Sequence, residues 1–414
     1  MWTAPWSRGL HPGLRHDVRL RRTRLEMEAR ERCGCLPVRF YEMSNMQIID
    51  RGVIFDASSV EGPLRVCSFT SLLRLSSGTL LASFRRGSAK DSADGNIIVC
   101  ESTDEGANWS VISEGFETTF EGLSGEIRST ELAELDDGRL LAVEGWVDRS
   151  GGSGVLRDAE TDSMPSMHIL QDYSSDGGRT WGERRVLKRD AVLSGPVMRL
   201  PGRGWLATSE FSHPGTPDRE RFHGAYAHFS ADGETFEAMV DVVDEDPDIF
   251  FYDQRQKVCP RTGRPVALYW TYDNRAESDI EMHVAWGDAE TLTWQTPRSM
   301  GLVGQIAMPI PLQDGRLLAF YVHRHEPGSL RLIGSADEGL TWDVENELVV
   351  YSSSGPGEQG ISDETTYDEF WDAMGTWSFG HPTAAVLGDG SLLLAYYAGA
   401  DESCLSVHWA RVEV

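Results

Sequence analysis

The sequence predicts an all-β protein, a six-bladed β-propeller of four-stranded blades that is closed by its N-terminal strand. Three observations predict this fold class. A short turn motif recurs along the chain, an apolar β-hairpin precedes each copy, and the last of six such units lacks one strand. A ring of similar blades accounts for all three, because each blade buries its faces against its neighbours and a terminal strand can complete the last blade.

The recurring turn reads Ser-x-Asp-x-Gly-x-Thr-Trp. Residues 174–181 and 335–342 match it in full, and 102–109 differ by one Asn in place of Thr. Two degenerate copies lie at 230–236 and 287–294. In a tight turn the Ser and Asp side chains bond backbone amides, Gly takes the positive φ angle, and the aromatic residue packs inward at the start of the next strand. The motif therefore predicts structural turns.

A hairpin of two apolar strands around a glycine turn occurs six times. The turn glycines are Gly78, Gly138, Gly204, Gly263, Gly315 and Gly390. Third strands are expected at residues 96–101, 167–173, 225–229, 281–286 and 329–334, each followed by the turn motif and a fourth strand. The sixth unit ends with a strand at 406–414, so the strand at 46–55 is expected to close the ring.

The strand order also assigns the two faces of the propeller. In each blade the first strand runs toward the hairpin turn and the second runs back, so the hairpin turns and the recurring motif share one face. The opposite face gathers the starts of first strands, the ends of second strands and the loops between blades. Aligned on the turn glycines, the first strands place a ring of residues at that face: Ser68, Arg128, Ser194, Asp253, Gln305 and Gly380. We expect the functional site there.

The Ser-x-Asp-x-Gly-x-Thr-Trp turn resembles the Asp-box, or BNR repeat, of the sialidase (neuraminidase) superfamily, and the resemblance covers residues 46–414. It implies an exo-sialidase-like glycosidase in which three arginines hold the substrate carboxylate, a Tyr–Glu pair supplies the nucleophile and an Asp is the acid/base. Arg85 and Arg86, followed by Asp91 and Asp94, resemble the second arginine and the acid/base of that family.

Other positions depart from the family pattern. Ser68 stands where the family has its first arginine, and the nucleophilic Tyr is replaced by a segment that contains His381. Asp253 lies near the position of the family's Glu. The catalytic candidates are therefore Asp91, Asp94, Asp253 and His381. Polar and aromatic residues expected at the same mouth are the substrate-binding candidates: Arg85, Arg86, Arg128, Glu210, Tyr252, Arg255, Tyr272, His323, Arg324 and His325.

A long loop at residues 351–377 is expected to cross this face, and its aromatic residues, such as Trp371 and Trp377, suit stacking on sugars. Three functions stay open. The first is a glycoside hydrolase acting on an acidic sugar. The second is a polysaccharide lyase or another uronate-active enzyme, with His323, His325 or His381 as the base. The third is a non-catalytic glycan-binding propeller.

Composition excludes several other classes. The formal net charge is −27, from 65 acidic and 38 basic residues, so nucleic acid is not an expected partner, since binding it needs a basic surface. The six cysteines match no zinc-site spacing and no glycine-rich phosphate loop occurs, so neither a metal nor a cofactor is expected. The expected partner is an acidic glycan or glycoside substrate.

The first 45 residues differ from the rest of the chain. They hold nine Arg and five acidic residues, and they lack the apolar region of a signal peptide. We interpret the segment either as a disordered basic arm or as an extension upstream of a natural start at Met43 or Met46. No apolar run reaches the length of a membrane span. The expected location is therefore the cytoplasm or an unknown compartment.

Overall fold

The computed structural model describes residues 46–152, 156–158, 160–211, 224–243, 246, 248–325, 327–353 and 367–414. The segment 1–45, interpreted above as an arm or an extension, lies outside the described residues. None of the helices in the described ranges combines the length and the apolar character that crossing a membrane requires.

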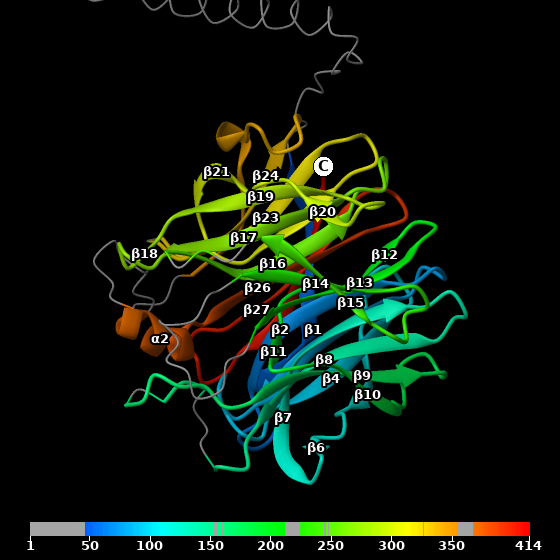
Figure 1. Cartoon of the computed structure of the whole chain (residues 1–414), viewed down its shortest axis with the longest axis vertical. Coiled ribbons are helices and arrows are strands. Elements are labelled where there is room, and N and C mark those ends of the chain that lie inside the picture. The colour runs from blue at the N-terminus through cyan, green and yellow to red at the C-terminus, as the bar shows by residue number, and fades with distance from the viewer. Residues whose placement is uncertain are drawn as a thin grey trace, which may run out of the picture. The chain divides into compact units, whose positions relative to one another are not determined.

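The described chain is nearly all β, and its strands form six antiparallel sheets, the blades of a six-bladed propeller (Figure 1). Blade 1 consists of β2 (Val66–Arg74), β3 (Leu80–Gly87), β4 (Asn96–Ser102) and β5 (Ser110–Glu114). Blade 2 consists of β7 (Leu123–Glu134), β8 (Leu140–Asp148), β9 (Met167–Ser174) and β10 (Gly182–Arg189), with the short β6 (Thr119–Phe120) paired to β7. Blade 5 consists of β22 (Ala307–Pro311), β23 (Leu317–His323), β24 (Ser329–Ser335) and β25 (Leu348–Ser352).

Blades 3 and 4 contain interrupted strands. Blade 3 consists of β11 (Ala191–Leu193), β12 (Met198–Leu200), β13 (Gly204–Phe211), β14 (Ala225–Ser230) and β15 (Ala238–Val243). Its first strand is split because Pro196 has no amide hydrogen to donate to the ladder. Blade 4 consists of β16 (Ile249–Val258), β17 (Pro265–Asp273), β18 (Ser278–Asp279), β19 (Glu281–Asp288), β20 (Thr293–Trp294) and β21 (Arg298–Val303).

Blade 6 closes the ring as the sequence predicts. It consists of β26 (Phe379–Val386), β27 (Leu392–Ala398), β28 (Ser406–Glu413) and the N-terminal strand β1 (Gln47–Phe55). β1 pairs with β28 in antiparallel register, from Gln47 opposite Glu413 to Phe55 opposite Val407. In Figure 1 the blue first blade lies beside the red last one, where β2 contacts β26.

The hydrophobic core is divided among the six junctions between blades. Each of the six main clusters of buried side chains combines residues of two neighbouring blades. For example, Phe320 of blade 5 belongs to one cluster with Leu394 of blade 6, and Phe84 of blade 1 to another with Trp409 of blade 6. Since no blade buries its faces alone, stability depends on a closed ring.

The recurring turns are held by the side-chain bonds that their sequence predicts. In the turn at 174–181, the Asp176 carboxylate accepts from the amide of Thr180 at 2.9 Å and from its hydroxyl at 2.7 Å. The Ser174 hydroxyl accepts from the amide of Gly178 at 2.9 Å, and Trp181 Nε1 donates to the Gly178 carbonyl at 3.1 Å. Asp337 makes the same two bonds to Thr341, so these turns share one geometry.

The expected loop at 351–377 is partly helical, which corrects the prediction. Helix α2 (Tyr367–Thr376) occupies its C-terminal part, and residues 354–366 lie outside the described ranges. Glu369 favours the first turn, because an acidic side chain complements the positive end of a helix dipole. Two 3₁₀ turns, η1 (Ala57–Ser59) and η3 (Val344–Asn346), complete the described elements.

The role of β1 in closure gives a testable prediction. A chain that begins at residue 56 should melt at a clearly lower temperature than one that begins at residue 46, because blade 6 loses its outer strand and β28 becomes an unpaired edge. Thermal unfolding followed by circular dichroism measures the difference. Equal melting temperatures for the two chains would contradict closure by β1.

Candidate functional site

A cavity of about 180 Å³ lies at the propeller axis, and all six blades contribute to its wall. Its residues come from the starts of first strands, the ends of second strands and the adjoining loops, which is the face that the strand order assigned to function. Its polar and aromatic lining comprises Ser68, Phe69, Lys90, Asp91, Arg128, Ser129, Glu131, Glu210, Tyr252, Asp253, Arg255, Trp270, Arg324, Trp377, His381 and Tyr397. Its apolar lining comprises Leu156, Met164, Met167, Val192, Leu193, Ile306 and Met374.

Eight of the fourteen candidates from the sequence line this cavity. They are Asp91, Arg128, Glu210, Tyr252, Asp253, Arg255, Arg324 and His381. The other six lie elsewhere in the fold: Arg85, Arg86, Asp94, Tyr272, His323 and His325. Of the ring positions, Ser68, Arg128 and Asp253 line the cavity, whereas Ser194, Gln305 and Gly380 do not. Of the candidates from the ends of second strands, Glu210 and Arg324 line it.

The six outlying candidates have identifiable surroundings. Arg85 is fully buried against Glu126, and Arg86 forms an ion pair of 3.2 Å with Glu114 at the outer side of blade 1. The Asp94 carboxylate accepts from the amide of Ser88 at 3.0 Å, so it shapes the loop in which it lies. Three further rings pack behind the wall: Tyr272 lies along Phe250, and His323 lies 5.8 Å from His325 between ring centres.

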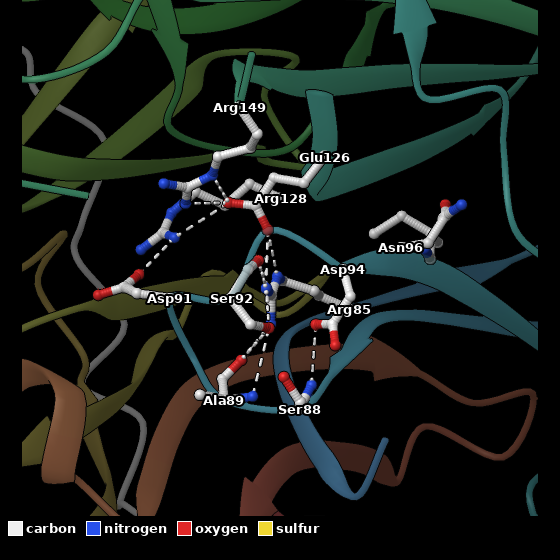
Figure 2. A network of polar contacts seen from close by, with 11 residues as sticks. Arg85, Ser88, Ala89, Asp91, Ser92, Asp94, Asn96, Glu126, Arg128 and Arg149 are labelled. Atoms are coloured by element: carbon white, nitrogen blue, oxygen red, sulfur yellow. Dashed lines mark hydrogen bonds and ion pairs between the residues drawn. The ribbon is translucent and has the colours of Figure 1, made fainter. Parts of the chain in front are cut away.

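Arg128 and Asp91 form the ion pair at the blade 1 and blade 2 side of the cavity (Figure 2). Arg128 Nη1 lies 2.6 Å from Asp91 Oδ1, and the guanidinium group stacks over the Phe69 ring at 4.7 Å. Burial opposes ionisation of Asp91, but Arg128 outweighs it by its charge and hydrogen bond, and Lys90 and Arg85 contribute further. The pKa of Asp91 is therefore below its ordinary value, and this carboxyl group is ionised at neutral pH.

Asp253 of blade 4 lines the same cavity in a different environment. It has a left-handed backbone with φ of 44°, and its amide donates to Glu210 Oε1 at 2.6 Å. One third of its side chain is exposed to the cavity, and its carboxylate lies 3.5 Å from Arg255. Burial nevertheless raises the pKa of Asp253, although Arg255 and Arg128 act in the opposite direction. The two cavity aspartates therefore differ in the sign of their pKa shifts.

Irregular backbone is concentrated at this level of the ring. Phe69, Asp253 and His381, from three different blades, all have positive φ angles of 44° to 53°. Each lies where the pairing of its first strand shifts register, in β2, β16 and β26 respectively. Non-glycine residues avoid such angles because of steric strain, so strained residues that share one cavity wall indicate a functional site.

His381 is buried as a neutral imidazole between two fixed partners. Its Nε2 lies 2.8 Å from Arg255 Nη2, which can only donate, and its Nδ1 lies 3.4 Å from the carbonyl oxygen of Thr70. Burial and the charge of Arg255 lower the pKa of His381 well below its ordinary value. The lone pair of Nε2 is thus engaged by Arg255, and the ring supports that arginine.

Glu131 lies in the cavity floor and holds Arg255 from the other side. Its carboxylate is 3.2 Å from Arg255 Nη1 and accepts from the Ser71 hydroxyl at 2.6 Å. Burial raises the pKa of Glu131, with Arg255 and Ser71 acting in the opposite direction. As the pH falls, Glu131 and Asp253 therefore take up protons before ordinary carboxyl groups do, and the net positive charge of the wall increases.

Cations and aromatic rings form the blade 5 and blade 6 side. The Arg324 guanidinium lies 4.1 Å from the Trp377 ring centre and 4.3 Å from that of Phe379, and its Nη2 donates to the Phe379 carbonyl at 2.7 Å. Lys90 Nζ lies over Trp377 and Tyr397 at 5.3 and 5.5 Å, and it donates to the carbonyl of Met374 in α2 at 2.6 Å. This side is both basic and aromatic.

Sequence reasoning missed several wall residues. Lys90, Phe69, Glu131 and Tyr397 carried no motif, and only the alignment of blades places their side chains at the axis. Regular strand alternation would place Glu131, three positions after Arg128, on the opposite face, but β7 has a register shift between Ile127 and Ser129, and both residues line the cavity. Trp270 was also missed; its indole donates to Asp279 at 2.6 Å, and burial raises the pKa of that aspartate to about 6.

Within the described ranges, no group of three or more His, Cys, Asp or Glu residues is arranged to hold a metal ion. The four cysteines in these ranges are free thiols: Cys67, Cys100, Cys259 and Cys404. The side chains that line the cavity supply carboxyl, guanidinium, ammonium, imidazole, hydroxyl and aromatic groups.

The chain matches no protein-family model and no curated protein sequence. It does share its fold with several solved structures. A protein of unknown function from Dyadobacter fermentans is 16% identical, with a TM-score of 0.66, over 90% of this chain and 100% of the other. An intramolecular trans-sialidase from Ruminococcus gnavus, in complex with oseltamivir carboxylate, is 12% identical, with a TM-score of 0.54, over 87% and 97%.

A third similar structure is an α-L-arabinanase from Penicillium chrysogenum in complex with arabinobiose. It is 14% identical, with a TM-score of 0.55, and the match covers 88% of this chain and 98% of the other. The fold is therefore sialidase-like, as the turn motif implied, and it is also the fold of arabinan-active proteins. At these identities the likeness concerns the fold, and the activity has to be argued from the cavity.

Proposed function

We propose that this protein is a glycoside hydrolase that removes an acidic sugar. The observation that carries the proposal is the pair of cavity carboxyl groups, Asp91 and Asp253, whose pKa values are displaced in opposite directions. Glycosidases use two carboxyl groups in this way, one protonated to donate to the leaving oxygen and one ionised to assist attack at the anomeric carbon.

The roles follow from the two environments. Asp253, whose protonated form is favoured, is the general acid that donates a proton to the glycosidic oxygen. Asp91, held ionised by Arg128, is the carboxylate that activates water or stabilises positive charge at the anomeric carbon. This assignment moves the acid role from Asp91 or Asp94, where the sequence pattern suggested it, to Asp253 of blade 4.

The wall also favours a sugar that carries a carboxylate. Four cations, Lys90, Arg128, Arg255 and Arg324, line the cavity together with four carboxyl groups, two of which have raised pKa values. When Asp253 and Glu131 are protonated, the wall carries an excess of positive charge, and guanidinium groups bind carboxylates through two parallel hydrogen bonds. Tyr252, Trp270 and Trp377 supply rings for the apolar faces of the sugar.

The lyase alternative receives less support from the geometry. It needs a histidine free to take a proton from the substrate, and His381 accepts from Arg255 through the nitrogen that would do so. His323 and His325 lie outside the cavity wall. A carboxyl pair, in contrast, is present in the wall.

The direct experiment is a screen with fluorogenic glycosides of a sialic acid, of glucuronic acid and of L-arabinofuranose. We expect release of the fluorophore from an acidic glycoside at mildly acidic pH. Release from the arabinofuranoside alone would contradict the acidic substrate while retaining the hydrolase. An unsaturated uronate product from a 4-linked oligouronide, whose 4-O-linked sugar is the leaving group of the elimination, would indicate the lyase, and binding without turnover of any glycan would indicate a binding propeller.

The role of Asp253 is tested by the variant Asp253→Asn. Its kcat should fall by about 10²-fold or more on a glycoside with an alkyl leaving group, because the leaving oxygen then has to be protonated. The loss should be much smaller with an aryl leaving group, which departs as a weakly basic phenolate. Asp241→Asn is the matched control, since Asp241 is an exposed residue of the outer strand β15 and lies outside the cavity lining, and it should retain nearly full activity. Equal losses on both substrates would exclude Asp253 as the general acid.

A further inference from the structure

A fully buried carboxylate, Glu126 of β7, binds arginines from three parts of the chain without lining the cavity (Figure 2). Its Oε2 accepts from Arg85 Nε at 2.9 Å and from Arg85 Nη2 at 2.7 Å. Its Oε1 accepts from Arg149 Nε at 3.2 Å and lies 3.7 Å from Arg128 Nη1. Burying four charged groups lowers the stability of the fold unless each is well paired, so we looked for a function that explains this cluster.

The remaining donors of Arg85 hold the loop between β3 and β4, residues 88–95. Nη1 donates to the carbonyl of Ala89 at 2.7 Å, and Nη2 donates to the carbonyl of Ser92 at 2.6 Å and to its hydroxyl at 3.0 Å. Lys90 and Asp91 lie between these two anchors and are the loop residues that reach the cavity. The position of Asp91 therefore depends on Arg85, and that of Arg85 depends on Glu126.

The same carboxylate acts on the other side of the loop. Arg128 lies between Glu126 and Asp91, with 3.7 Å to the first and 2.6 Å to the second. Arg149, directly after β8, begins the connection whose Leu156 and Met164 line the cavity. Glu126 thus connects two loops of the rim and the arginine between them.

Two glycines leave the space that this cluster occupies. A Cβ atom on Gly95 would lie 2.3 Å from Arg85 Nε and 2.3 Å from Glu126 Oε2. A Cβ atom on Gly87 would lie 2.7 Å from Arg85 Nη1. The glycine at 95 has no left-handed backbone angle, so close approach of the ion pair is the reason for its small size.

We infer that Glu126 is a positioning residue: through Arg85 it fixes the loop 88–95 that presents Asp91 to the cavity, and through Arg128 and Arg149 it ties that loop to blade 2. The catalytic meaning of Asp91 rests on the proposed function. The positioning itself does not, because it concerns the geometry of the folded chain and can be measured without a substrate.

The test compares Gly95→Ala with Gly182→Ala. Gly182 opens β10, and a Cβ atom there would meet nothing within 4 Å, so this control adds the same methyl group at a harmless place. In Gly95→Ala the amides of residues 88–95 should exchange at least about tenfold faster, because the loop loses its anchors. The Asp91 carboxyl group, followed by ¹³C NMR, should titrate at higher pH than in the wild type, because it moves away from Arg128.

Gly182→Ala should leave both readouts unchanged. If Gly95→Ala folds and neither the exchange rates nor the titration of Asp91 changes, the inference is overturned. Should this variant fail to fold, the same two measurements are made on Arg85→Lys. The lysine keeps a positive charge beside Glu126, but its single ammonium group cannot donate to Ala89, Ser92 and Glu126 together. Unchanged readouts in that variant would also overturn the inference. Absence of turnover in the wild type would count against the proposed function alone.

Discussion

The pairing of β1 with β28 is the constraint on which the rest of the structure depends. It joins the two ends of the propeller domain, and it completes the last of six junctions in which neighbouring blades bury their apolar faces together. The cavity depends on this closure because its wall takes residues from every blade. A ring that opened at blade 6 would displace His381 of blade 6 from Arg255 of blade 4.

The cavity also contains features that lower the stability of the fold. First strands that are regular elsewhere become irregular at the axis, where Phe69, Asp253 and His381 have left-handed backbones. Buried charges accumulate at the same level, and each is held by partners from another blade, as Glu131 holds Arg255. Such features lower stability, and they persist because the surrounding blades determine them. The contrast between the pKa values of Asp91 and Asp253 arises from this arrangement. Arg128 lowers the pKa of Asp91, whereas desolvation raises the pKa of Asp253 by more than Arg255 and Arg128 lower it.

Much of the fold could be predicted from the sequence because strand period and turn chemistry are local. The third strands, expected at 167–173 and 281–286 for example, are β9 (Met167–Ser174) and β19 (Glu281–Asp288) in the structure. The site was harder to predict, because a residue at a strand end can face either the axis or the next blade. Arg85 ends its strand as Glu210 does, yet it turns into the protein toward Glu126, a partner 41 positions away. Helix α2 was missed although Tyr367, Phe370, Trp371 and Met374 recur at the i, i+3, i+4, i+7 spacing of an amphipathic helix, because the segment was interpreted only as a loop between blades.

Two aspartates of one cavity have pKa values that their surroundings displace in opposite directions. Site-resolved ¹³C NMR of the carboxyl carbons, assigned with Asp91→Asn and Asp253→Asn, measures this most directly and requires no knowledge of the substrate. Asp253 should titrate above the ordinary aspartate pKa of 3.8, and Asp91 should titrate below it. Coincident titrations near 3.8, or the reverse order, would contradict it.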